Sequence, residues 1–137
     1  MIIFNYEISP AFHGPSLTEF DNVILRITIE NTPANNVTII RDGKKITSTL
    51  QESDINQIIE LYSRNPRIFD IRQLEANNVA DGNQFDFFFS DGVKSTRVVA
   101  FNIGQYGDIP HPDADLFIRI VKSVRTILDQ NHIYTNN

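Results

Sequence analysis

The stretch that decides the fold is residues 81–104, DGNQFDFFFSDGVKSTRVVAFNIG, which predicts a β-hairpin. Two runs of strand-forming residues are joined by Asp91-Gly92, a pair typical of two-residue hairpin turns in which both positions take positive φ. Such a turn places Ser90 opposite Val93 and thereby determines every later pairing along the hairpin.

The predicted register gives the hairpin one polar and one apolar face. Asp86 faces Arg97, and their opposite charges favour the pairing. Phe85, Phe87 and Phe89 form an apolar row on the other face, opposite Val98, Thr96 and Lys94. A slip of one residue would place this row in water, so we expect it to face a core covered by helices.

Three further stretches have the composition of strands. Residues 2–9 and 22–30 alternate apolar and polar side chains, the period of a strand with one buried face. A second hairpin is predicted around Asp42-Gly43. Its turn gives two cross-strand pairs, Ile39 with Ile46 and Arg41 with Lys44. Residues 67–72 are expected to add a short strand.

Apolar residues at helical spacing predict two helices. The first follows an N-cap at Thr49 or Ser53 and ends at Asn65-Pro66. The second begins at Pro112 and carries an apolar stripe made of Leu116, Phe117, Ile120, Val121, Val124, Ile127 and Leu128.

No Pro-rich or Ser-rich linker divides the chain, and both helices need a sheet against which to bury their stripes. We therefore expect residues 1–137 to form a single α+β domain. Its antiparallel sheet should contain six to seven strands built from hairpins, with the two helices packed on one face.

Composition excludes several classes of protein. The chain has no Cys, so disulfides, thiolate metal sites and cysteine nucleophiles are excluded. The formal net charge of -5 disfavours a protein that binds nucleic-acid phosphates. Residues 1–7 lack the features of a signal peptide, and no stretch has the length of a membrane span, so we expect a cytoplasmic protein without membrane contact.

The excess acid is concentrated in one part of the sequence. Residues 81–115 contain only two bases, Lys94 and Arg97, against Asp81, Asp86, Asp91, Asp108, Asp113 and Asp115. Two interpretations stay open at this point. The acids either keep a solvated surface soluble or form a patch that steers a basic partner.

Motifs of enzymes and cofactor sites are absent from the sequence. It contains no glycine-rich phosphate loop, no nucleophile elbow and no two-histidine helical metal motif, so no cofactor is predicted. His13 and His111 could act as a general acid-base pair if their loops met. His111 could hold a divalent metal with Asp108, Asp113 and Asp115.

The proline-rich turn favours a simpler hypothesis for these carboxylates. Asp113 caps the second helix, His111 is exposed, and the ligand geometry of a dedicated metal site is missing. Neither catalytic nor metal-binding residues are therefore predicted. Phe12 and Tyr106 are more informative, because an aromatic ring on a loop of Gly and Pro either fills a core edge or contacts a partner.

In size, acidity, absence of Cys and absence of catalytic motifs, the chain is similar to small bacterial immunity proteins, which neutralise a cognate toxin by covering its active site. This resemblance implies a non-enzymatic binding protein whose partner is a basic, nuclease-type toxin domain. The residues expected to bind it are Phe12, Tyr106, Asp108, His111, Asp113 and Asp115.

Two other functions are alternatives. A small-ligand carrier would hold its ligand in a pocket between the Phe-rich sheet and the last helix. A hydrolase would use His13 and His111.

Overall fold

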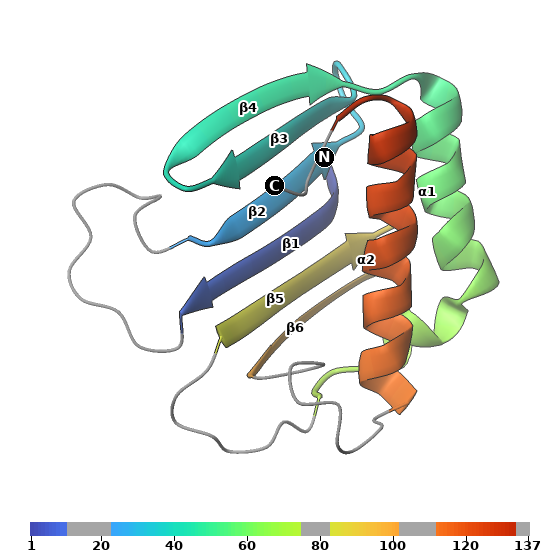
Figure 1. Ribbon diagram of the computed structural model, residues 1–137. Helices are drawn as coiled ribbons and strands as arrows, with labels where there is room; N and C mark the ends of the chain where they lie inside the picture. Colours follow the sequence, from blue (N-terminus) through green and yellow to red (C-terminus); the bar gives the residue numbers. More distant parts are fainter. Residues whose placement is uncertain (11–22, 75–82, 102–111, 134–137) are drawn as a thin grey trace.

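An antiparallel sheet with two helices forms the fold (Figure 1). The computed structural model describes residues 1–10, 23–74, 83–101 and 112–133. The six strands are β1 (Ile2–Pro10), β2 (Leu25–Glu30), β3 (Asn36–Arg41), β4 (Lys44–Thr49), β5 (Asn83–Ser90) and β6 (Ser95–Phe101). They are arranged in the order β4-β3-β2-β1-β5-β6. The predicted α+β fold with an antiparallel sheet is confirmed.

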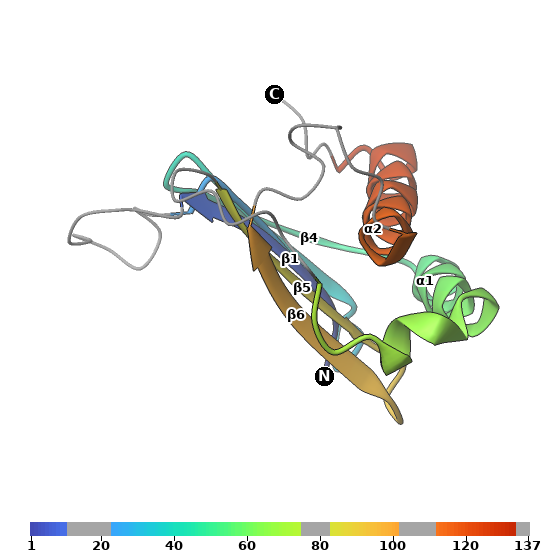
Figure 2. The same ribbon diagram turned by 90° about the horizontal axis from the view of Figure 1, so that it is seen from below.

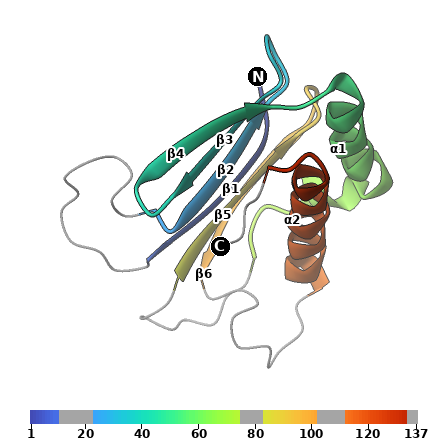
Figure 3. The same cartoon turned by 45° about the horizontal axis from the view of Figure 1, so that its top comes forward.

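Two α-helices, α1 (Glu52–Arg64) and α2 (Pro112–Gln130), lie on the same face of this sheet, as Figures 2 and 3 show. A short 3-10 helix, η1 (Pro66–Asp70), follows α1. The hydrophobic core lies between the two layers and contains side chains from the sheet and from both helices. We call the other face of the sheet, away from α1 and α2, the open face.

The aromatic row of β5 lies at the centre of this core, as the sequence predicted. Phe87 and Phe89 are fully buried, and Phe85 is partly buried against the same cluster. The rings of Phe87 and Phe89 each lie 5.2 Å, centroid to centroid, from the ring of Phe117 on α2. Phe89 also contacts Tyr62 on α1 at 5.7 Å. The row therefore joins the sheet to both helices.

The turn between β5 and β6 is longer than predicted, so the predicted register was wrong. Ser90 pairs with Ser95, which leaves four residues in the turn instead of two. Asp86 consequently lies opposite Val99, not opposite Arg97. Because the shift is two residues, every side chain keeps its predicted face. The aromatic row faces Ala100, Val98 and Thr96.

The side chain of Asp91 explains the wider turn. Its carboxylate accepts hydrogen bonds from the backbone N–H groups of Val93, at 2.8 Å, and Lys94, at 2.7 Å. Such local bonds stabilise a turn that does not need positive φ at both central positions. Positive φ occurs here only at Gly92. At Asp42-Gly43, by contrast, φ is positive at both residues, and the predicted pairs Ile39–Ile46 and Arg41–Lys44 are confirmed.

Two local predictions were wrong. Residues 67–72 do not form a strand, because Pro66 begins the 3-10 helix η1, and a proline at the first helical position is already held at a helical φ. Helix α1 has Gln51 as its N-cap, and the backbone N–H of Gln51 donates to Asp54 Oδ2 at 3.2 Å. Thr49 instead belongs to β4, which displaces the predicted cap.

We predict that Phe87→Ala lowers the free energy of unfolding by about 3 to 5 kcal/mol, since it empties space at the centre of the core. The measurement is urea denaturation. Val99→Ala is the control, because Val99 lies on the open face with 42% of its surface exposed and should change stability by less than about 0.5 kcal/mol. A loss below about 1 kcal/mol for Phe87→Ala would contradict the central position of this ring.

We also predict that Asp91→Ala costs about 1 kcal/mol at neutral pH. The hydrogen bonds from the N–H groups of Lys94 and Val93 lower the pKa of Asp91 below its ordinary value of 3.8. The stabilisation is therefore complete above pH 3.8 and is lost as the pH falls through the lower folded-state pKa. Denaturation curves at several pH values should show the difference from wild type shrinking in acid. Asp91→Asn, which keeps a side-chain acceptor, should retain most of the stability at neutral pH.

Candidate functional site

Only part of the predicted binding site lies within the described residues. Asp113 is half-buried at the start of α2 and forms an ion pair with Arg67, at 2.8 Å. Asp115 is exposed one position further along the helix from Ala114. The other predicted site residues, Phe12, Tyr106, Asp108 and His111, lie outside the described ranges, as does His13 of the hydrolase hypothesis. Their predicted roles stay predictions.

The charges of the described residues balance. All 12 Lys and Arg residues lie in the described ranges. Five of the 17 acids lie outside them, which leaves 12 acids against 12 bases. Those five are Glu19, Asp21, Glu75, Asp81 and Asp108. The entire formal net charge of -5 therefore belongs to three connecting segments, residues 11–22, 75–82 and 102–111.

The strand ends that border these segments lie together at one end of the sheet. Pro10, the last residue of β1, pairs with Asn83, the first residue of β5. Gln84 pairs with Phe101, the last residue of β6. On the other side of β1, Ile8 pairs with Leu25, the first residue of β2. Figure 1 shows these four strand ends side by side. We call this the segment end of the sheet.

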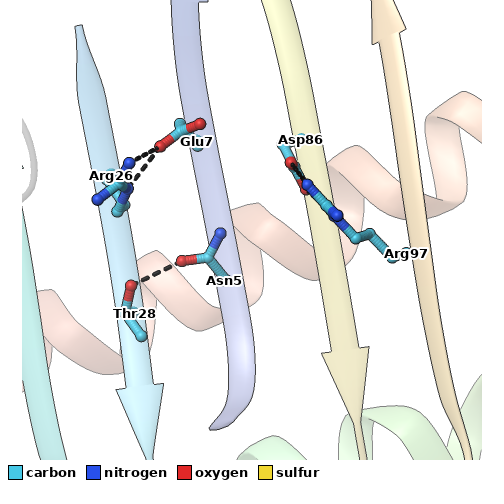
Figure 4. Close-up of polar contacts among 6 residues, drawn as sticks. All are labelled: Asn5, Glu7, Arg26, Thr28, Asp86 and Arg97. Atoms are coloured by element: carbon cyan, nitrogen blue, oxygen red, sulfur yellow. Dashed lines mark hydrogen bonds and ion pairs between the residues drawn. The ribbon is translucent and has the colours of Figure 1, made fainter. Parts of the chain in front are cut away.

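A group of paired polar side chains occupies the open face (Figure 4). Arg26 on β2 forms an ion pair with Glu7 on β1, the residue directly opposite it. Thr28 on β2 donates a hydrogen bond to Asn5 Oδ1 on β1, at 2.6 Å. These contacts join the two strands on the face opposite the helices.

Asp86 and Arg97 form the matching ion pair between β5 and β6. Arg97 donates from Nε to Asp86 Oδ1 at 3.3 Å and from a terminal guanidinium nitrogen to Oδ2 at 2.7 Å. These hydrogen bonds and the charge of Asp86 raise the pKa of Arg97. The contact is diagonal, because Arg97 lies directly opposite Phe88. The two predicted partners therefore meet, although not in the predicted register.

The four charged groups follow one another across the sheet. Glu7 is the direct neighbour of Asp86 across the β1–β5 pairing, so two carboxylates lie side by side. Each is bound by an arginine on its outer side, Arg26 or Arg97. A groove of about 410 Å³ runs over this row, lined also by Ile2, Asn5, Thr28 and Phe88.

Across the described ranges, no three His, Asp or Glu side chains lie close enough together to hold a metal ion. The metal hypothesis involved Asp108 and His111, which lie outside these ranges, so the predicted absence of that site stays a prediction. None of the helices in the described part of the chain is long and apolar enough to cross a membrane.

The sequence prediction missed the pairing of Glu7 with Arg26. Both residues occupy polar positions in alternating strands, so their face could be predicted from the period alone. Their contact required knowing that β1 lies between β2 and β5, which the periodicity does not show.

No family model, curated protein or solved structure matches this chain. Its function is therefore inferred from the residues and the geometry described above.

We predict that Arg97→Ala lowers the free energy of unfolding by about 1 to 2 kcal/mol, because it leaves the carboxylate of Asp86 without its guanidinium partner. Asp86 is only 6% exposed, so water cannot fully replace that partner. Arg64→Ala is a matched control, since Arg64 is similarly exposed and also lies 2.7 Å from a carboxylate, that of Glu60. We expect it to change stability by less than about 0.5 kcal/mol in chemical denaturation. Equal losses in the two variants would contradict a structural role for the Asp86–Arg97 pair.

Proposed function

We propose that the protein is a non-enzymatic protein-binding module, and more specifically an immunity protein of the bacterial cytoplasm that covers the active site of a basic, nuclease-type toxin. The segment end of the sheet is the part that meets the toxin. Tyr106 supplies an aromatic anchor there, and the acids of the connecting segments attract the partner.

The observation that carries this proposal is the separation of charge. The described residues carry 12 acids and 12 bases. The three segments that hold the net charge of -5 are all attached to strand ends at the segment end. An acidic region of this kind speeds association with a basic protein, because long-range attraction steers the encounter.

Not all of the acids in residues 81–115 are available to attract a partner. Asp86 and Asp113 already have arginine partners, Arg97 and Arg67, so they contribute little free negative charge. Asp115 is exposed and remains available to a partner. The acids that matter most are therefore Asp108 and those of the two other connecting segments.

Packing argues against the alternative of a small-ligand carrier. The space between β5 and α2 is occupied where Phe87 and Phe89 contact the ring of Phe117. A ligand at that position would have to displace closely packed aromatic rings, which costs free energy.

Charge neutralisation tests the proposal. We expect the triple variant Asp21→Asn, Asp81→Asn, Asp108→Asn, with one change in each segment, to slow association about tenfold at low ionic strength. Association should be measured by surface-based kinetics against the product of the adjacent gene at two salt concentrations. Tyr106→Ala should instead speed dissociation and cost about 2 kcal/mol or more of binding free energy.

The matched control is Glu30→Gln, Glu52→Gln, Asp54→Asn, which removes the same charge elsewhere. Glu30 pairs with Ile2 at the opposite end of the sheet, and the other two residues belong to α1. We expect these changes to alter association by less than about twofold. If both triple variants slow association equally, only the overall charge matters, and the segment end is not the binding surface.

A further inference from the structure

The open face presents its charges unequally to solvent. The carboxylates of Glu7 and Asp86 are largely covered, with side-chain exposures of 18% and 8%. The guanidinium side chains are more exposed, 30% for Arg26 and 66% for Arg97. Lys45, on the same face of edge strand β4, is exposed as well. Glu30, at the end of β2 and opposite Ile2, is a half-buried carboxylate on the same face. Around Arg97 and Arg26, however, an approaching molecule meets cationic groups first.

Arg97 is held in a defined orientation. Two of its nitrogens donate to the two oxygens of Asp86, which fixes the plane of the guanidinium group. Asp86 is itself immobilised by burial on the central part of the sheet. An arginine fixed by a buried carboxylate and otherwise open to solvent loses little conformational entropy when it binds a second acidic group.

We propose that the groove on the open face binds an extended acidic segment of a partner protein, with one carboxylate of that segment bound by Arg97 and another by Arg26. The half-buried ring of Phe88 and the side chain of Ile2 form the apolar part of this groove. The open face would bind acidic groups, whereas the segment end would bind a basic partner. This inference therefore does not depend on the function proposed above.

The sheet determines the spacing that the ligand needs. Arg26 and Arg97 lie on β2 and β6, which are separated by β1 and β5. Three inter-strand spacings put the two backbone positions about 14 Å apart across the sheet. Each guanidinium group leans inward to the carboxylate that it binds, so the two cationic groups lie closer together than their backbones. In an extended peptide, residues i and i+4 project from the same side about 13 Å apart. Two acidic residues on the same side of one extended segment can therefore reach the two arginines through their flexible side chains.

The test uses the full chain and a capped heptapeptide, Gly-Glu-Ser-Ala-Ser-Glu-Gly, whose glutamates have this spacing. Chemical shifts of the backbone amides and of the arginine Nε–H groups are followed by NMR during titration. We expect shifts at Arg26, Arg97 and neighbouring open-face residues, and none at Arg64, which has similar exposure and an equivalent ion pair on α1. Arg97→Lys keeps the charge but loses the paired donors, and should weaken binding about tenfold. Arg64→Lys should leave it unchanged.

Peptides with two glutamines or two lysines in place of the glutamates are the ligand controls, and neither should shift these signals. A peptide with adjacent glutamates should bind more weakly than the spaced one. The proposal is wrong if the spaced peptide causes no shifts, if Arg64 responds as strongly as Arg97, or if Arg97→Lys binds as well as wild type. The proposal is also wrong if a short thymidine oligonucleotide binds the same residues more tightly than the spaced peptide does, because the partner would then be a nucleic acid and not an acidic protein segment.

Discussion

The packing of one aromatic row determines how the layers of this protein are joined. Strand β5 lies between β1 and β6, and its alternate residues Phe85, Phe87 and Phe89 are directed at the helices. Phe89 contacts Phe4 on β1, Tyr62 on α1 and Phe117 on α2. Two hydroxyls buried beside these rings have partners: that of Tyr62 donates to the backbone oxygen of Ile3 at 2.6 Å, and that of Thr96 donates to the backbone oxygen of Ile71 at 2.8 Å. Because the rings contact the sheet and both helices at once, the helices have one favourable position over the sheet.

On the open face, ion pairs take the place of apolar packing. A sheet covered on one side leaves alternate side chains to water, and here these include two carboxylates on neighbouring strands, Glu7 and Asp86. Like charges at this position repel each other, and burial of a carboxylate is costly unless it is paired. Arg26 and Arg97 provide those partners from the outer strands. The carboxylates are thereby covered and the arginines exposed, which gives the open face its preference for acidic ligands.

The charges of the chain are distributed unevenly between the described residues and the connecting segments. The described residues are neutral as a whole, and some of their charges form local ion pairs, such as that of Arg67 with Asp113. The net negative charge belongs to connecting segments attached to one end of the sheet. The two proposed surfaces therefore differ in charge, in position and in the elements that carry them.

The sequence by itself determined which side chains share a face, where two helices form and how the Asp42-Gly43 turn pairs its strands. These are local properties, since the period of two along a strand, the helical period and the φ preferences of a turn depend on neighbouring residues. The sequence also predicted that Asp86 and Arg97 lie on the same face. This part of the prediction survived, because the β5–β6 register differs from the predicted one by two residues and a shift of two keeps every side chain on its face. Only the tertiary structure decided that β1 lies between β2 and β5, and hence that Glu7 meets both Arg26 and Asp86. Pairing between strands distant in sequence depends on which edges and apolar faces fit together across the whole sheet, and no local pattern specifies that choice.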